Sequence, residues 1–331
     1  MTNTKFDVLG IGNAIVDIIG RCDDAFLARH GAPKGHMRLV DAETVSRLYK
    51  DMGPGVEVSG GSVANTMVGI ASFGGRAAFI GKVAEDEFGR IFAHDIRAAG
   101  VHFETPLSTS GVPTARCLIL VTPDGERTMN TYLGVSPDLN RGEVNPELIQ
   151  SAGIIFLEGY LFDRPEAKDA FRQAAGIAAA AGRKVALSLS DGFCVDRHRE
   201  EFLDLVKNSV DILIANENEI TSLYQVATFE EAMQQAQADT ELAVLTRSAQ
   251  GSVICEKGIE PIVIPAMAAD VVDVTGAGDL YAAGFLYGFA RGLDLATAGR
   301  LGSIAAAEVI SHFGARPQKN LAELARTQGL I

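Results

Sequence analysis

The sequence contains no tryptophan and only four cysteines, none of them in a C-x-x-C pair. The wide spacing of the cysteines and the lack of a secretory leader predict a reduced, cytoplasmic protein. The six histidines show no H-E-x-x-H or comparable spacing, so we expect no zinc site of that kind. No apolar run approaches the ~20 residues that a membrane-spanning helix needs, so we expect no membrane partner.

Basic residues are also scarce, because 29 Lys and Arg stand against 42 Asp and Glu, a net charge of −13. This charge disfavours binding to nucleic acids or anionic membranes, since both are polyanions. An acidic protein can still bind a phosphate group through helix N-termini or single arginines. We therefore expect a small-molecule partner, and the sequence leaves a monomer and a homodimer equally open.

Two common phosphate-binding motifs are missing. There is no G-x-x-x-x-G-K-[ST], which excludes a P-loop. The stretch GIGNAI starts like a dinucleotide fingerprint, with Gly10-x-Gly12, but Ile15 stands at the third glycine position. The fingerprint should lead into a helix, whereas the β-branched residues that follow favour a strand. A nicotinamide cofactor is therefore not expected.

Short apolar runs alternate with Ala-rich helical segments along most of the 331 residues. Continuous apolar strands that alternate with helices are typical of a sheet covered on both faces, so the fold class is α/β, doubly wound and mostly parallel. The expected strands lie at 6–12, 77–81, 153–158, 184–190, 211–216, 242–247, 252–255 and 261–264. The expected helices lie at 62–73, 86–99, 165–181, 198–208, 217–224, 229–238, 277–291 and 295–312.

Residues 15–42 and 102–133 break this alternation, with Gly, Pro and Thr among short alternating strands such as TARCLILV. We interpret both segments as one small, discontinuous β lid over an edge of the sheet, with two long surface loops as the alternative. The large domain then comprises 1–14, 43–101 and 134–331. Because ligands of open parallel sheets bind beyond the C-terminal ends of the strands, the motifs at those ends are the candidates for function.

Two of these motifs are weak by themselves. In GGSVAN, Gly60-Gly61 precedes a helix and Asn65 lies one turn inside it, where it could project into the cleft. Taken alone, the stretch favours the simpler interpretation, a loop with Ser62 as the N-cap. NENE (216–219) places two acids in the first turn of a helix, which the helix dipole favours. The functional alternative is that Asn216 and Glu219 arrange water around Mg²⁺.

The stretch DVVDVTGAGD (270–279) is more specific. Backbone N–H groups from Thr275 to Gly278 converge at a helix N-terminus and suit the charge that develops on a transferred phosphoryl group. Asp279, in the first turn, is placed to accept a proton from a substrate hydroxyl. Helix capping by Asp279 is the alternative, but it explains neither the glycines on both sides of Ala277 nor the second acid, Asp273.

Taken together, DVTGAGD, NENE and the stretch GGSVANTMVGIASFGGRAAFIGKVAEDEFG resemble the signatures of the PfkB, or ribokinase-like, family of small-molecule kinases over roughly 1–316. The resemblance implies a doubly wound domain with a β lid, and ATP and Mg²⁺ as cofactors. It implies that Asp279 is the catalytic base and that Gly276, Ala277 and Gly278 form the anion hole. Residues implied on the ATP side are Asn216 and Glu219, which hold Mg²⁺ indirectly, with Thr246, Gly251 and Thr275. Asp273 is implied near a monovalent cation such as K⁺.

Within that family, GNAIVDI, GGSxxN and the long stretch 23–56 look like adenosine kinases more than sugar kinases. This likeness implies that Phe193 and Ile15 sandwich an adenine, that Met129 closes the pocket and that Arg127 approaches the phosphates. The other residues implied in substrate binding are Asn13, Asp17, Gly60, Gly61, Ser62 and Asn65. The expected reaction transfers the γ-phosphoryl group of ATP to the 5′-hydroxyl of adenosine, giving AMP and ADP, as in purine salvage. A sugar kinase of the same fold and a non-catalytic nucleoside sensor are the alternatives.

Overall fold

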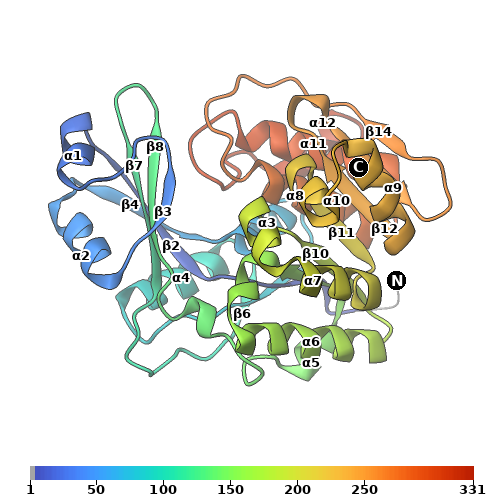
Figure 1. Cartoon of the computed structure of the whole chain (residues 1–331), viewed down its shortest axis with the longest axis horizontal. Helices are drawn as coiled ribbons and strands as arrows, with labels where there is room; N and C mark the ends of the chain where they lie inside the picture. Colours follow the sequence, from blue (N-terminus) through green and yellow to red (C-terminus); the bar gives the residue numbers. More distant parts are fainter. Residues whose placement is uncertain (1–3) are drawn as a thin grey trace.

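The computed structural model describes residues 4–331, and within this range one sheet of nine strands forms the centre of the protein (Figure 1). Its strands are β1 (Phe6–Ile11), β5 (Ala77–Ile80), β6 (His102–Phe103), β9 (Ala152–Glu158), β10 (Lys184–Ser188), β11 (Ile212–Asn216), β12 (Leu242–Thr246), β13 (Ser252–Glu256) and β14 (Ile262–Ile264). The spatial order is β14-β13-β12-β11-β10-β9-β1-β5-β6. All neighbours from β12 to β6 pair in parallel, and β13 is antiparallel to both of its neighbours. The predicted α/β class is confirmed.

Helices cover both faces of this sheet and bury its side chains in two cores. In β1, Val8 packs in one core and the next residue, Leu9, in the other, because successive side chains of a strand point to opposite faces. The first core is covered by α3 (Ser62–Ser72), α4 (Glu87–Ala98), α10 (Ala277–Ala290), α11 (Leu295–Val309) and α12 (Leu321–Thr327). The second is covered by α5 (Pro146–Gln150), α6 (Pro165–Ala180), α7 (Gly192–Ser209), α8 (Glu217–Tyr224) and α9 (Phe229–Asp239). Of the helices in residues 4–331, none has the length and apolar character required to cross a membrane.

The predicted strands and helices of the large sheet all form, with one clear difference in a helix boundary. The helix expected at 198–208 begins at Gly192, because the Asp191 side chain accepts a hydrogen bond from the Cys194 backbone N–H and caps an additional turn. The helix departs from helical geometry at His198, where φ is −126° and ψ is 23°. Because of this kink, the apolar residues before and after His198 do not follow one continuous helical periodicity, and the sequence predicted only the part after it.

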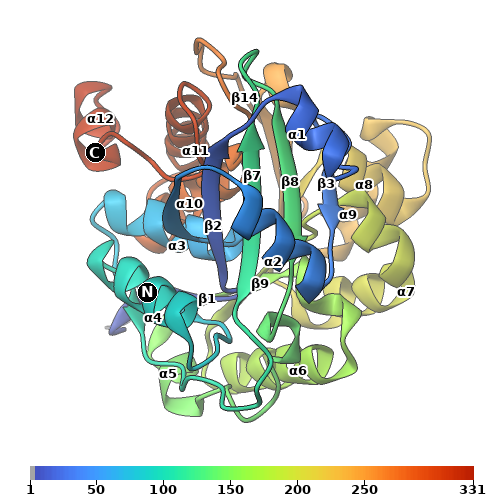
Figure 2. The same cartoon turned by 90° about the vertical axis from the view of Figure 1, so that its left-hand side faces the viewer.

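A second sheet stands beside the first at one end of the molecule (Figures 1 and 2). In the described part of the chain it has the order β3-β8-β7-β2-β4. Its strands are β2 (Ile15–Arg21), β3 (Met37–Leu39), β4 (Gly55–Gly60), β7 (Ala115–Val121) and β8 (Arg127–Tyr132), and α1 (Asp24–Arg29) and α2 (Ala42–Asp51) lie in the connections between β2 and β4.

The predicted boundaries of this β unit need correction. The sequence placed 43–101 in the large domain, yet β4 pairs antiparallel with β2 along its whole length, so the chain up to Gly60 belongs to the small sheet. Conversely, β6 opens the predicted lid segment 102–133 but pairs with β5 in the large sheet. Both errors concern short strands whose membership depends on pairing with strands far away in the sequence.

Candidate active site

The N-terminus of α10 is open to a ligand. Gly276 is its N-cap with a φ of +79°, and no side chain caps the helix. A Cβ at this position would lie 2.8 Å from the Cα of Ala315, so only glycine fits. The unsatisfied N–H groups of a helix N-terminus, together with the helix dipole, form an anion site. Within residues 4–331, the Gly276 and Gly278 N–H groups have no hydrogen-bond partner, whereas the Ala277 N–H donates to the Val274 carbonyl at 3.2 Å. The anion hole expected at Gly276 to Gly278 stays a prediction, with two of its three donors free.

Asp279 lies in the first turn of α10, but its carboxylate points to α3. Ser62 Oγ donates to Asp279 Oδ1 at 2.7 Å, and Asn65 Nδ2 donates to Oδ2 at 3.0 Å. Thr66 Oγ1 also donates to the backbone carbonyl of Asp279 at 3.0 Å. Asp279 is thus not the cap of its own helix, and neither is Ser62 the cap of α3, whose N-cap is Gly61.

The surroundings of Asp279 make its carboxylate a stronger base than an exposed one. Burial raises the pKa of Asp279, while the hydrogen bonds from Ser62 and Asn65 and the charge of Arg316 lower it in part. The Asn65 Oδ1 atom is buried and has no hydrogen-bond partner within residues 4–331. It therefore remains available to accept a hydrogen bond from a hydroxyl group beside Asp279.

Asp17 on β2 adds a second carboxylate close to the start of α3. A Cβ at Gly60 would lie 2.3 Å from Asp17 Oδ2, so the glycine makes room for this carboxylate. Burial raises the pKa of Asp17 to about 7, with Arg316 and Arg127 opposing the shift and Asp279 adding to it. The structure thus brings Asp17, Gly60, Ser62, Asn65 and Asp279 of the prediction into one neighbourhood.

Two residues of this neighbourhood were missed by the sequence analysis. Glu158, at the end of β9, accepts from Asn13 Nδ2 at 2.7 Å and from the Val63 backbone N–H at 3.0 Å. It is 1% exposed, and burial raises its pKa to about 7. The signal was present, because Glu158 is the one charged residue that ends the apolar run GIIFLE. Arg316 stands in no recognisable sequence motif, yet its charge lowers the pKa of both Asp17 and Asp279.

Arg127 and Asp273 form a pair between the small sheet and the loop before α10. Arg127 Nη1 lies 2.5 Å from Asp273 Oδ2, and both side chains are buried. Asp273 also accepts from Thr275 Oγ1 at 2.8 Å and from the Gly314 backbone N–H at 3.1 Å. This arrangement gives no support to the K⁺ site expected near Asp273, because a guanidinium already neutralises the carboxylate.

The NENE motif is a capping box at the start of α8. Asn216 Oδ1 accepts from the Glu219 backbone N–H at 2.9 Å, and Glu219 Oε2 accepts from the Asn216 backbone N–H at 2.9 Å. Burial raises the pKa of Glu219 to about 7, and the charges of Asp191 and Asp279 add to the shift. Within residues 4–331, no three His, Cys, Asp or Glu side chains group in a way that would hold a metal ion directly.

The remaining predicted residues come from several elements. Asn216 pairs with Thr246 at the ends of β11 and β12, and Gly251 has a φ of +85° in the turn before β13. Ile15 opens β2, and Met129 lies on β8. Phe193 is 78% exposed in the first turn of α7, so its ring is free to contact a ligand.

Comparison with known proteins places this geometry in a family. Residues 50–321 match the pfkB family carbohydrate kinase domain. Among solved structures, the chain is similar to a probable sugar kinase protein from Rhizobium etli CFN 42, with 50% identity, a TM-score of 0.92 and coverage of 99% of this chain and 100% of the other. It is also similar to the adenosine kinase from Sinorhizobium meliloti, with 51% identity, a TM-score of 0.90 and coverage of 98% and 99%.

A curated relative from a plant shares the same domain. The chain is 33% identical over 273 residues to a probable fructokinase-6, chloroplastic, from Arabidopsis thaliana, covering 79% of this chain and 70% of the relative. The family domain covers well over half of the sequence and includes the α3, α8 and α10 motifs. The chain therefore belongs to the PfkB family of carbohydrate kinases and is a phosphotransferase with an alcohol group as acceptor.

Proposed function

We propose that this kinase transfers the γ-phosphoryl group of ATP to the 5′-hydroxyl of adenosine, giving AMP and ADP. The observation that carries the choice of acceptor is the ring of Phe193, which is 78% exposed in the first turn of α7. This turn follows the C-terminal end of β10, and we call the edge of the sheet formed by the C-terminal ends of β9, β10 and β11 the catalytic edge. A purine needs a flat apolar surface, whereas a bare sugar does not. The high identity to the S. meliloti adenosine kinase supports the same acceptor.

The chemistry follows from the residues around Asp279. Its carboxylate accepts the proton of the acceptor hydroxyl while that oxygen bonds to the γ-phosphorus of ATP, and the bond to the bridging oxygen breaks to release ADP. The free N–H groups of Gly276 and Gly278 stabilise the charge on the moving phosphoryl group. Asp17 and the free Asn65 Oδ1 accept hydrogen bonds from the ribose hydroxyls. Arg127 approaches the phosphates from the small sheet.

The ATP side of the site fits a hydrated Mg²⁺. Glu219, Asp191 and Asp279 lie near enough that the other two charges raise the pKa of Glu219, so the site has an excess of negative charge. Asn216 and Glu219 would hold Mg²⁺ through water, and Thr246, Gly251 and Thr275 would contact ATP. Bound Mg²⁺ supplies neutralisation of the β- and γ-phosphate charge.

A sugar kinase is the second candidate, and a specific observation favours it. Asp17 and Asn65 bind hydroxyl groups in general, so the same machinery serves a sugar such as fructose. The fructokinase relative from A. thaliana is consistent with that assignment. The two candidates differ in the role of Phe193, because an adenosine kinase needs its ring to contact the purine and a sugar kinase does not.

A ligand panel tests the proposal. We expect adenosine, but not guanosine, ribose or fructose, to raise the thermal stability, by about 2.7 kcal/mol at ~100 times its Kd. Coupled ADP release with adenosine then separates a kinase from a nucleoside sensor. Phe193→Ala should weaken adenosine binding far more than ATP binding. Selective stabilisation and turnover by ribose or fructose would instead establish the sugar kinase.

A further inference from the structure

Two turns with incompletely buried aromatic side chains follow neighbouring strands of the large sheet. The 3-10 turn η2 (Gly159–Asp163) follows β9 and carries Tyr160, which is 39% exposed. The first turn of α7 follows β10 and carries Phe193, which is 78% exposed. β9 and β10 are parallel neighbours, so both turns lie at the same edge of the sheet. Burial and then the charges of Asp191 and Asp279 raise the pKa of Tyr160.

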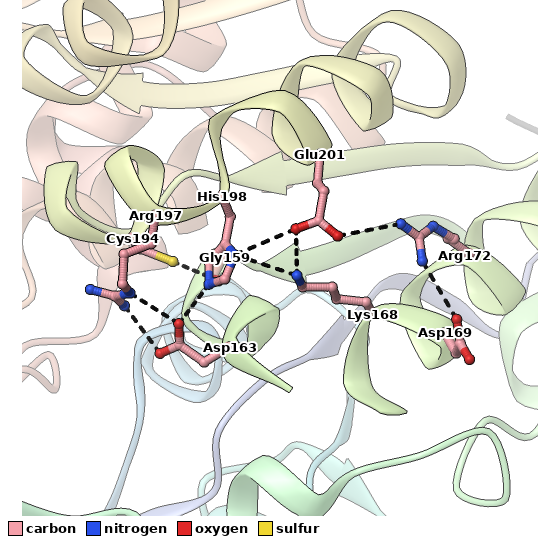
Figure 3. Close-up of polar contacts among 9 residues, drawn as sticks. All are labelled: Gly159, Asp163, Lys168, Asp169, Arg172, Cys194, Arg197, His198 and Glu201. Atoms are coloured by element: carbon pink, nitrogen blue, oxygen red, sulfur yellow. Dashed lines mark hydrogen bonds and ion pairs between the residues drawn. The ribbon is translucent and has the colours of Figure 1, made fainter. Parts of the chain in front are cut away.

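Asp163, the last residue of η2, connects this turn to the second turn of α7 and to the kink at His198 (Figure 3). Its Oδ1 and Oδ2 atoms accept from Arg197 Nε and Nη2, both at 3.1 Å, in bidentate geometry. Both side chains are about half exposed, so the value of this pair lies in its fixed geometry more than in its energy. The same Oδ1 lies 2.7 Å from His198 Nε2. The Cys194 thiol adds one weaker link, since it donates to the Gly159 carbonyl at 3.2 Å.

The kink at His198 makes this connection important for the start of α7. Beyond the kink, Phe202, Leu205 and Val206 are buried and anchor the helix in the core. Before the kink, residues 192–197 form less than two helical turns. The Asp191 cap and the buried side chains of Cys194 and Val195 hold the start of this segment, and its last residue, Arg197, lies on the surface. Asp163 adds an attachment from outside the helix at the other end of the segment, because it binds Arg197 and His198.

His198 itself is held firmly at the kink. Its ring lies edge-on to Phe162, with the ring centroids 6.2 Å apart. Its Nδ1 atom lies 3.4 Å from Glu201 Oε2 and 3.4 Å from Lys168 Nζ, and Lys168 pairs with Glu201. The ring thus offers Asp163 a fixed attachment point (Figure 3).

We propose that Asp163 is a positioning residue for acceptor recognition, which fixes the segment of α7 before its kink (residues 192–197) to η2 so that Phe193 and Tyr160 are presented together to a planar base. The inference rests on the proposed function in that the acceptor is a nucleoside. Asp163 contacts none of the residues that surround Asp279, so it acts on acceptor binding and not on phosphoryl transfer.

Kinetics of Asp163→Ala separate these effects. We expect the KM for adenosine to rise about tenfold while kcat and the KM for ATP change by about twofold or less. Asp163→Asn should recover part of the loss, because its carbonyl oxygen still accepts one hydrogen bond. Asp169→Ala is the matched control, since Asp169 pairs with Arg172 at 3.5 Å on α6 without joining the two turns. An unchanged KM for adenosine in Asp163→Ala, or an equal rise for both substrates, would overturn the proposal.

A fluorescence measurement tests the positioning without any acceptor. The chain has no tryptophan, so Phe193→Trp introduces a single reporter at the turn. In that background, Asp163→Ala should lower the emission anisotropy and increase quenching by acrylamide, whereas Asp169→Ala should change neither. An anisotropy unaffected by Asp163→Ala would refute the positioning role. Failure of adenosine turnover in the unmodified enzyme, with the anisotropy change present, would instead refute only the proposed acceptor.

Discussion

The N-termini of α8 and α10 use a buried acid in opposite ways. Both helices start near the catalytic edge, and each has an acid in its first turn, Glu219 in α8 and Asp279 in α10. Glu219 directs its oxygens to Asn216 of its own helix, and the N-terminus of α8 is thereby capped. Asp279 is held by two side chains of α3, and the N-terminus of α10 is left without a side-chain cap. The acid suited to chemistry is the one held by another helix, because its own helix keeps the Gly276 and Gly278 N–H groups free for an anion.

The largest effect should come from Asp279→Asn, which removes the base and keeps the shape of the side chain. Loss of a positioned base typically costs ~10²–10⁴ in rate, so we expect kcat to fall by that range while the thermal midpoint changes little. Steady-state kinetics and a melting curve measure both quantities. If the variant turned over at nearly the wild-type rate, Asp279 would not be the base, and the acid of α10 would be structural like the acid of α8.

Asn65→Ala should have a smaller effect on the same carboxylate. In the wild type, the hydrogen bond that Asn65 donates to Asp279 Oδ2 lowers the pKa of Asp279, and the substitution removes this bond. We expect kcat to fall about tenfold. Because the pKa then rises, Asp279 becomes protonated at higher pH, and the acidic limb of the pH–rate profile should move to higher pH. Thr66→Val is the control, since Thr66 Oγ1 donates to the backbone carbonyls of Asp279 and Ser62 and not to the Asp279 carboxylate. A lower rate with an unmoved acidic limb would contradict a role of Asn65 in tuning the base.

These two variants also mark what the sequence could and could not predict. The apolar runs and the residues that flank them predicted the strands and helices of the large sheet and located the motifs GGSVAN, NENE and DVTGAGD. These features depend on residues that are close together in the sequence. The bonds from Ser62 and Asn65 to Asp279 cross more than 200 residues, and local patterns gave no distances for them. The resemblance to a family supplied that link. Nothing local distinguished β4 from the large domain or paired Arg127 with Asp273, since both depend on tertiary contacts.

Asp17 extends the comparison to a carboxylate without a hydrogen bond to any residue in 4–331. We expect Asp17→Asn to raise the KM for the acceptor about tenfold, because a ribose hydroxyl loses a charged acceptor. In the wild type, the KM should rise as the pH falls below about 7, where Asp17 becomes protonated. Measurement of KM between pH 6 and 8 tests both, and a pH-independent wild-type KM would contradict the role of Asp17.

The same pKa makes a prediction for stability. The pKa of Asp17 is higher in the folded protein than in the unfolded chain, so the folded state binds more protons between the ordinary value of 3.8 and about 7. Asp17 therefore destabilises the fold as the pH rises through this window. Asp17→Asn should raise the thermal midpoint relative to the wild type at pH 8 and lose that advantage at pH 4. A variant less stable than the wild type at pH 8 would show that the carboxylate has a structural partner.

The smallest effect is expected at the capped helix, and it tests whether α8 is only structural. Asn216→Ala removes the side-chain acceptor for the Glu219 N–H and should cost about 1 kcal/mol of stability. Asn216→Ser should restore that stability, because serine caps a helix about as well as asparagine. The kinetics of Asn216→Ser then report the effect of losing the side-chain amide without a loss of stability. A normal KM for Mg-ATP in Asn216→Ser means that the residue acts as a cap alone. A raised KM at restored stability is the result that the proposed contact with hydrated Mg²⁺ predicts, and Asn216 would then both cap α8 and serve Mg-ATP.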